Sequence, residues 1–297
     1  MSELRVGVSG WNYDHWRNGG FYPQNLPRNR ELEYITRHFN SAEINGSFYS
    51  LLNPGTYEKY RNSAPEGFLY AVKGSRFITH SKKLKDVRIP LANFLASGVL
   101  RLEEKLGPFL WQFPQMEWPI ERVEEFLDLL PSDTQAAGRL AKQHDERVTG
   151  RASMVVHESQ PIRHALEFRH PHFLTEQVVR LCRERQVALV ISDSGGAWPL
   201  VEEVTTDFTY LRLHGSPQVY ASPYDDAQLH YWAQRIQSWE RGDEPQDARR
   251  ITELGPPGRG KRGVYAYFDN DQHAHAPRNA LQLMELLGIE IGATGPA

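Results

Sequence analysis

The stretch HALEFRHP, residues 164–171, combines the pattern of a buried strand with ionisable side chains. Leu166 and Phe168 fall on one face of such a strand and Glu167 and Arg169 on the other, because successive strand side chains point to opposite faces. One apolar and one charged face suit a closed sheet, whose outer face packs against helices while its inner face borders a lumen. We therefore expect Glu167 and Arg169 to point into a polar interior.

Strand-like runs of this kind recur along the whole chain of 297 residues. They are RVGVSGW (5–11), SAEINGSFY (41–49), FLYAVKGS (68–75), GPFLWQFP (107–114), HALEFRHP (164–171), VALVISDS (187–194), FTYLRLHG (208–215) and GVYAYFDND (263–271). Stretches with helical periodicity separate most of them, and PRNALQLMELLG (277–288) reads as a closing helix. Eight alternating units predict an α/β protein with a parallel sheet closed into a (β/α)8 TIM barrel.

An open, doubly wound sheet is the alternative fold. Such a sheet usually has a glycine-rich phosphate loop after its first strand, whereas GVSGWNYDHW (7–16) offers aromatic residues there. The segment between Asp193 and Phe208 is too short for a full helix, so we expect an irregular sixth unit. No repeat or linker marks a second domain, and residues 1–297 are predicted to form a single domain.

Composition limits the classes of function. A net charge of −3 provides no global attraction to nucleic acid or to an anionic membrane. The single cysteine, Cys182, excludes an internal disulfide and fits a reducing cytoplasm. No apolar run approaches the roughly 18 residues of a membrane span. The sequence therefore predicts a soluble, cytoplasmic protein with no membrane partner, and leaves the oligomeric state open.

Polar residues recur on the lumen face of the other strands, toward the carboxyl end of each. They are Glu43, Asn45, Lys73, Gln112, Asp193, Arg212, His214 and Asp269. Enzymes with this fold assemble their sites at that end of the barrel. A purely structural interpretation would pair Glu43 with Lys73 and Glu167 with Arg169. Buried pairs are often no better for stability than apolar packing, so the convergence favours a functional site.

Two loops extend the predicted site. The loop after the first strand carries Trp11 and Tyr13, which could form an aromatic wall or lid, or only cap the barrel. The loop after the third strand begins with Lys73 and Arg76 and continues into further basic residues. This positive rim suits a phosphate or carboxylate group, although a merely solvated loop has the same composition.

Successive motifs also resemble a known family. GWNYDHWRNGGFYP, AEINGSFY, AVKGSRFITHSKKL, LWQFP, EFRHPHF, SDS, YLRLHG and YFDNDQHAHAPRNAL follow in order from about residue 5 to residue 287. They are similar to the signatures of the YecE-like family, also called domain of unknown function 72. The resemblance implies a TIM barrel and no particular reaction. The positions that match its characteristic polar residues are Glu43, Asn45, Lys73, Arg76, His80, Gln112, Glu167, Arg169, Asp193, Arg212, His214, Asn270 and Asp271. FDND replaces the more frequent FNND, so Asp269 adds an acid here, and HPHF replaces a more usual tryptophan ending.

The first functional hypothesis is an enzyme acting on a small phosphorylated or carboxylated molecule. The candidate catalytic residues are Glu43, Glu167, His214 and Asp193, as general acids, bases or proton carriers. The candidate substrate-binding residues are Lys73, Arg76, Arg169, Arg212, Asn45, Gln112, Trp11, Tyr13, Asp269 and Asn270. Lys73 is expected to be an electrostatic anchor, because a neighbouring carboxylate would keep it charged and oppose a Schiff base.

Two alternatives remain open. One is nucleic-acid binding or processing, which by analogy with barrel endonucleases would require a metal site. Glu167, Asp193, His214 and Asp269 could supply ligands, but the histidines are sparse, so no cofactor is expected and a divalent metal is the less favoured choice. The other alternative is a non-catalytic sensor that binds a metabolite in the barrel mouth.

Overall fold

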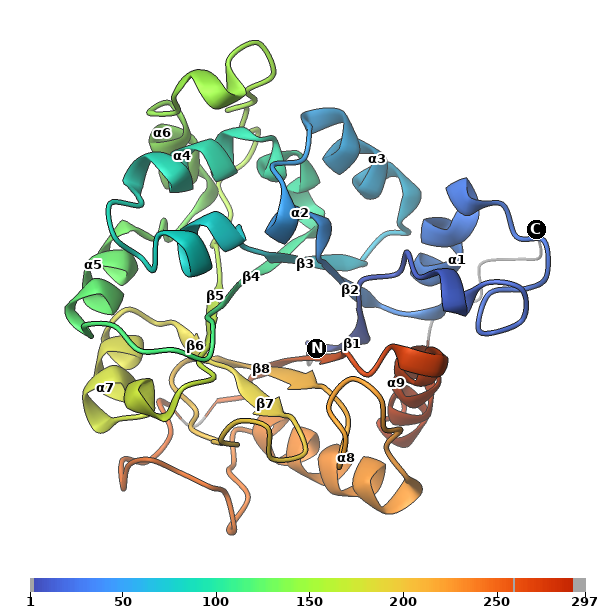
Figure 1. The fold of residues 1–297 in the computed structure, drawn as a ribbon. Coiled ribbons are helices and arrows are strands. Elements are labelled where there is room, and N and C mark those ends of the chain that lie inside the picture. Colours follow the sequence, from blue (N-terminus) through green and yellow to red (C-terminus); the bar gives the residue numbers. More distant parts are fainter. Residues whose placement is uncertain (1–2, 259, 291–297) are drawn as a thin grey trace.

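The computed structural model describes residues 3–258 and 260–290, in which parallel strands form a nearly closed ring with helices outside it (Figure 1). The strands are β1 (Leu4–Ser9), β2 (Ser41–Ile44), β3 (Leu69–Lys73), β4 (Leu106–Gln112), β5 (His164–Glu167), β6 (Ala188–Leu189), β7 (Ile191–Asp193), β8 (Phe208–Leu213) and β9 (Gly263–Phe268). They are hydrogen-bonded in the order β6-β5-β4-β3-β2-β1-β9-β8-β7. The predicted α/β barrel is confirmed.

Helices follow most strands in the described chain. They are α1 (Glu31–His38), α2 (Gly46–Tyr49), α3 (Pro54–Ser63), α4 (Arg88–Ala96), α5 (Glu121–Leu129), α6 (Thr134–Ala141), α7 (Glu176–Glu184), α8 (Asp226–Glu240) and α9 (His275–Leu286). Side chains set several of their starts: Thr175 accepts the Val178 N–H at α7, and Asp225 forms a reciprocal capping box with Gln228 at α8. Among these helices, none is long and apolar enough to cross a membrane.

The run 41–49 was expected to be a strand throughout, and its second half is not. Strand β2 ends at Ile44 and the chain turns into the short helix α2. The Ser47 hydroxyl donates to the carbonyl of Ile44 and to that of Lys73 on the neighbouring strand. These bonds hold the chain in a turn, since a serine side chain that satisfies nearby backbone groups competes with strand pairing.

The sixth strand is irregular, as its short following segment suggested. Its first half, β6, pairs with β5, and its second half, β7, pairs with β8. Val190 lies at the switch and donates its N–H to Leu166. On the β6 side of the switch, the Leu189 N–H donates to the Thr205 hydroxyl and is therefore not available for pairing with β8. The segment between β7 and β8 forms no helix, so a loop replaces the sixth helix of the barrel.

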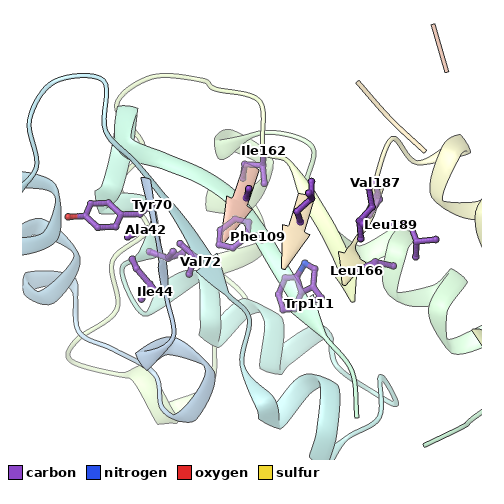
Figure 2. Close-up of a cluster of buried hydrophobic side chains, with 14 of the residues drawn as sticks. Ala42, Ile44, Tyr70, Val72, Phe109, Trp111, Ile162, Leu166, Val187 and Leu189 are labelled. Atoms are coloured by element: carbon purple, nitrogen blue, oxygen red, sulfur yellow. The ribbon is translucent and has the colours of Figure 1, made fainter. Parts of the chain in front are cut away.

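Side chains separate by strand parity into two apolar groups. The outer group packs between strands and helices, and Figure 2 shows part of it, including Trp111, Leu166 and Leu189. The inner group fills the amino-terminal part of the lumen and consists of Ala71, Leu110, Ala165, Ala188, Val190, Phe208, Tyr210, Tyr265 and Tyr267. This aromatic-rich layer closes the bottom of the barrel, so polar side chains in the lumen are confined to the carboxyl end.

Gly74, which follows β3, has no room for a side chain. A Cβ there would lie 2.2 Å from the Trp111 ring, which is itself buried. We expect Gly74→Ala to lower the free energy of unfolding by about 1–3 kcal/mol, because overpacking displaces a fixed ring. Urea unfolding measures the change. Gly55→Ala in α3 is the control, because its Cβ meets nothing within 4 Å and should not destabilise the protein. Equal effects of both variants would contradict this account of Gly74.

Candidate active site at the barrel mouth

Arg212 on β8 lies at the centre of the polar lumen and is fully buried. Its Nη1 donates to Glu167 at 2.9 Å, and its Nη2 donates to Glu43 at 2.8 Å and to Asp269 at 2.9 Å. Its Nε donates to the second oxygen of Glu43 at 3.2 Å. One guanidinium therefore joins carboxylates from three strands or strand ends. We call Arg212, Glu43, Glu167, Asp269 and His214 the Arg212 network.

Glu43 is satisfied by neutral hydroxyl donors in addition to Arg212. Ser9 donates to Oε1 at 2.5 Å and Tyr210 donates to Oε2 at 2.7 Å. Both donors lie at lumen positions of their strands, at the level where the aromatic layer ends. Since a buried carboxylate is tolerated only when paired and hydrogen-bonded, these contacts explain why Glu43 can stand in the barrel interior.

Glu167 accepts the larger set of charged donors. Arg169 donates to Oε1 from Nε and Nη2 at 3.2 and 3.1 Å, and Ser192 donates to the same oxygen at 2.9 Å. Burial would raise the pKa of Glu167, but Arg169, Arg212 and His214 outweigh it and hold the pKa well below its usual range. Glu167 is therefore a carboxylate at neutral pH, not a proton donor.

His214 is enclosed between two carboxylates. Its Nε2 lies 3.0 Å from Glu167, and its Nδ1 lies 3.0 Å from Asp269 without hydrogen-bond alignment. The rings of Trp198 and Tyr220 meet it edge to face, at 5.0 and 5.5 Å between centroids. Both rings separate the imidazole from the open mouth. His214 is thus an interior member of the Arg212 network.

Asp269 connects this network to the mouth. Its side chain is 13% exposed, whereas those of Glu43 and Glu167 are fully buried. Burial raises its pKa, but Arg212, His214 and Lys73 outweigh this effect and hold the pKa below the usual aspartate range. Asp269 therefore presents a permanent negative charge at the carboxyl end of the barrel.

A cavity of about 560 Å³ opens above the network. Its lining consists of Tyr13, Asn45, Phe48, Tyr49, Lys73, His80, Gln112, Pro114, Gln115, Arg169, Trp198, Tyr220, Asp269 and Asp271. This volume suits a small metabolite. We call it the mouth cavity.

Arg169 forms one wall of the mouth cavity. Its guanidinium lies 4.0 Å from the centroid of the Trp198 ring, and its Nη1 donates to the Tyr220 hydroxyl at 3.0 Å. Guanidinium has five N–H donors, and the contacts to Glu167 and Tyr220 leave two of them for a ligand. The indole face fixes the plane of the cation while the side chain remains partly exposed.

Lys73, at the end of β3, is the second cation of the mouth cavity. Its Nζ lies 4.3 Å from the centroid of the Phe48 ring. Within the described chain no carboxylate oxygen lies within 4.0 Å of it, by contrast with the salt bridges of Arg169 and Arg212. Burial lowers the pKa of Lys73 to about 8, with the positive charge of Arg212 adding to the fall.

Two further titratable groups face the same space. Burial and the charge of Asp269 raise the pKa of Asp271 to about 6. Burial, together with the charges of Lys73, Arg76 and Arg169, lowers the pKa of His80 to about 4. Asp271 therefore exchanges its proton near neutrality, while His80 is neutral there. The cavity thus combines fixed charges with a carboxyl group, that of Asp271, that changes protonation near neutral pH.

The residues proposed from sequence either line the mouth cavity, lie directly beneath it, or lie apart from it. Lys73, Arg169, Asp269, Asn45, Gln112 and Tyr13 line the mouth cavity. Glu43, Glu167, His214 and Arg212 lie together beneath it. Arg212 was expected to hold a substrate anion, and its position corrects this: it is fully buried and all three nitrogens already donate to protein groups.

Asp193 and Arg76, also expected at the site, lie apart from the mouth cavity. Asp193 accepts the Tyr224 hydroxyl at 3.0 Å and the Gly195 N–H at 3.1 Å, and lines a neighbouring groove of about 910 Å³ beside α8. Arg76 is exposed on the loop after β3 and does not line the mouth cavity. Neither position supports direct contact with a ligand held by Lys73.

Trp11 and Asn270 likewise belong to the surrounding scaffold. Trp11 packs edge to face on Tyr60, with 5.3 Å between centroids. The Asn270 amide donates to the Ser222 carbonyl and to Asn279 on α9, both at 3.0 Å, which fixes the turn after β9. The parity of β9 explains this, since Asp269 points to the lumen and its neighbour in the chain points outward.

The ligand set considered for a metal does not assemble in the described residues. No group of three or more His, Cys, Asp or Glu side chains there is arranged to hold an ion. Glu167, His214 and Asp269 are close, but Arg212 occupies the space between them, and Asp193 bonds Tyr224 instead.

Comparison with known proteins identifies the family. The family model described as "Protein of unknown function DUF72" matches residues 5–297, nearly the whole chain. This chain belongs to the DUF72 family. The resemblance to the YecE-like family is thereby confirmed, and the barrel with its buried Arg212 network is a DUF72 barrel.

Relatives agree with this assignment. YunF of Bacillus subtilis (strain 168) is 23% identical over 321 residues, 99% of this chain and 98% of that protein. YecE of Escherichia coli (strain K12) is 26% identical over 132 residues, 44% of this chain and 45% of that protein. A DUF72 family protein of Thermotoga maritima has a TM-score of 0.71 at 22% identity, covering 96% of this chain and 99% of its own. Another, of Enterococcus faecalis V583, has a TM-score of 0.68 at 16% identity, covering 99% and 98%. The solved structures show the same fold.

Sequence reasoning missed several members of this DUF72 site. Trp198 and Tyr220 come from loops with no periodic pattern, and neither loop contains a local signal for its orientation. Ser9 and Ser192 lie at lumen positions that strand parity identifies, but small hydroxyl residues attract no attention in a search for charges. Phe48 was assigned to a strand and in fact lies in α2.

Proposed function

We propose that this protein is an enzyme that acts by acid–base chemistry on a small phosphorylated or carboxylated substrate in the mouth cavity. The observation that carries the proposal is that two cations, Lys73 and Arg169, line one small cavity with the charged Asp269 and the titratable Asp271. The location at the carboxyl ends of the strands is where barrel enzymes carry out their chemistry.

Anion recognition is assigned to Arg169 and Lys73. The two N–H groups left on Arg169 suit a carboxylate or phosphate, and stacking on Trp198 holds them in plane. Lys73 supplies a point charge with no carboxylate within 4.0 Å among the described residues. An anion bound here would pair with Lys73 without displacing an existing salt bridge of that lysine.

Proton transfer is assigned to Asp271 in place of the two glutamates. Glu167 keeps its negative charge, because its pKa is lowered, and Glu43 is enclosed by Ser9, Tyr210 and Arg212. Asp271 lines the cavity with a pKa of about 6, close to the value that favours proton exchange at neutral pH. The glutamates then act by fixing Arg212 beneath the cavity.

Arg169→Gln tests the anion site. We expect the variant to bind inorganic phosphate roughly 10–100-fold more weakly than the wild type, since a hydrogen bond to a charged group contributes about 1.5–3 kcal/mol. Isothermal titration calorimetry on folded protein measures the change. Arg180→Gln is the control, because Arg180 is exposed on α7 and pairs with Glu176 far from the cavity. Unchanged affinity in Arg169→Gln would contradict the assignment.

Turnover distinguishes the enzyme from the alternatives. Incubation with a panel of phosphorylated and carboxylated metabolites, followed by ³¹P and ¹H NMR, should give a product with the wild type and much less with Asp271→Asn. Tight binding of a panel member without product would instead support a metabolite sensor. Binding of an abasic oligonucleotide at low salt, with no response to small anions, would support the nucleic-acid alternative.

A further inference from the structure

Among the described residues, two lysines are buried, and their surroundings contrast. Lys105 donates from Nζ to the carbonyls of Arg61 and Ala64, at 2.6 and 2.5 Å, and this satisfies its charge. Lys73 is buried to a similar degree, with 9% exposed against 8%. Its Nζ faces the Phe48 ring and the mouth cavity, and no hydrogen-bond acceptor of the described chain is paired with it. Lys105 is a structural lysine, whereas the Lys73 amine is available to a ligand in the mouth cavity.

The base of the Lys73 side chain is rigidly placed. Its residue pairs with Leu110 across β3 and β4, and its carbonyl accepts the Ser47 hydroxyl at 2.6 Å. Phe48, whose ring lies beside Nζ, follows Ser47 in α2. The turn that ended β2 early therefore places an apolar ring against the amine. A buried lysine near another cation loses its proton more readily than a solvated one, which makes it a nucleophile.

Charged groups from several elements bear on the protonation of Lys73, and Arg169, His80 and Asp271 line the same cavity. Arg212 on β8 opposes the ammonium charge, while Glu43 on β2, Glu167 on β5 and Asp269 after β9 favour it. Each of these carboxylates is paired with Arg212, and burial is the dominant effect on the pKa of Lys73. With a pKa of about 8, roughly a tenth of the amine is free at pH 7.

We infer that Lys73 is a catalytic residue that forms a Schiff base, so that the substrate carries an aldehyde or ketone carbonyl besides its anionic group. This inference rests on the proposed anion site, in which Arg169 then holds the anionic end while Lys73 reacts with the carbonyl, and it names the substrate class: a 2-oxo acid or a phosphorylated sugar-like carbonyl compound. The expectation that a neighbouring carboxylate keeps Lys73 charged fails on geometry, because the described residues place none within salt-bridge distance.

The proposed step uses only water and groups that line the mouth cavity. The Nζ lone pair attacks the carbonyl carbon, a C–N bond forms, and a proton passes from nitrogen to the carbonyl oxygen to give a carbinolamine. Asp271 protonates its hydroxyl, which leaves as water while the nitrogen lone pair forms the C=N bond. The product is a protonated iminium, and Asp269 offsets its positive charge. Addition of the same water reverses the linkage, and no oxidant or reductant is required.

The iminium defines the chemistry that follows. It withdraws electrons from the adjacent carbon, so a C–H or C–C bond there is weakened, and this suits a lyase or isomerase acting next to a carbonyl. Arg169 would hold the anionic end of the substrate, on the wall formed with Trp198. The cavity of about 560 Å³ accommodates a molecule with both groups.

Reductive trapping tests the inference. The wild type is incubated with pyruvate or glyceraldehyde 3-phosphate and sodium cyanoborohydride, which converts an iminium into a stable secondary amine. We expect near-stoichiometric labelling of the peptide that contains Lys73, and no label on Lys105 in the same digest. Lys73→Arg should lose the label because guanidinium does not form the adduct, while Lys85→Arg, in the exposed part of the same loop, should keep it.

The pH profile separates Lys73 from solvated lysines. Its trapping rate, normalised to the reduction step, should be highest between about pH 6 and pH 8, because Lys73 must be free and Asp271 protonated, whereas exposed lysines continue to gain reactivity toward pH 10. Label spread over surface lysines, or none on Lys73, would overturn the Schiff base. If the wild type still binds inorganic phosphate in that case, the proposed anion site stands without it. If the wild type neither labels at Lys73 nor binds inorganic phosphate, the Schiff base and the proposed anion site are both overturned.

Discussion

Arg212→Met is expected to cause the largest loss of stability of any substitution in the barrel mouth. The change removes the cation that donates to Glu43, Glu167 and Asp269 and leaves three buried carboxylates facing one another. Breaking a single buried pair costs roughly 3–5 kcal/mol, so the loss at pH 7 should be at least that large. Methionine fills much of the same volume, which separates the loss of charge from the loss of packing.

The pH dependence of this variant should be opposite to that of the wild type. In the wild type the pKa values of Glu167 and Asp269 are lowered, so their contribution is present above the ordinary carboxyl pKa of about 4 and is lost as pH falls through the lowered values. Without Arg212, both pKa values rise, most of all that of Asp269, because Arg212 is the largest charge opposing burial there while Arg169 and His214 remain beside Glu167. Stability then declines as pH rises through them, and Arg212→Met should be more stable at pH 5 than at pH 8.

Unfolding in guanidinium chloride at pH 5 and pH 8 measures both the loss of stability and its pH dependence. Arg180→Met is the matched control, because Arg180 forms an exposed pair on α7 and should change stability by no more than about 0.5 kcal/mol. A variant at position 212 that is as stable as the wild type at pH 8 would show that Arg212 does not organise the carboxylates.

Glu167→Gln is the second large effect. The carboxylate accepts from Arg169, Arg212 and Ser192 and contacts His214, so the amide leaves two guanidinium groups without their shared anion. We expect a loss of about 3–5 kcal/mol at pH 7. The acid-induced loss below about pH 4 should shrink as well, because one carboxyl with a lowered pKa has been removed.

The same substitution at an exposed site provides the comparison. Glu176→Gln on α7 removes only the pair with Arg180 and should stay within about 0.5 kcal/mol of the wild type in urea unfolding. If Glu167→Gln instead unfolded with or above the wild type, the carboxylate would be a strained group held against stability, and the proton-transfer role considered from sequence would return.

Local sequence periodicity made much of the fold and of the lumen positions predictable. Strand parity correctly placed Glu167, Arg212 and Asp269 on the lumen face, because alternation along a strand needs no knowledge of the rest of the chain. The spacing after Asp193 correctly indicated an irregular sixth unit. Neither pattern contains the pairing switch at Val190, which depends on how β5 and β8 compete for one strand.

Roles within the site were harder to predict because they depend on three-dimensional neighbours. Arg212 was assigned to substrate because a guanidinium is a good anion ligand, yet three side chains from separate strands occupy its donors. Lys73 was assigned a carboxylate partner from the charge list of the lumen, whereas the turn at Ser47 places Phe48 beside it. The spacing of residues along the chain does not indicate which side chains contact Arg212 or Lys73 in the folded protein.

The pairing switch at Val190 also determines what holds the rim together. Above that residue no backbone ladder in the described chain joins β5 to β7, so the ring of sheet hydrogen bonds is open on the side of the mouth. Side chains bridge this opening: Ser192 of β7 donates to Glu167 of β5, and Arg169, after β5, stacks on Trp198, after β7. The two sides of the mouth are therefore joined by side chains in place of sheet hydrogen bonds, and Glu167, which pairs with Arg212 beneath the cavity, is also one of the groups that joins them.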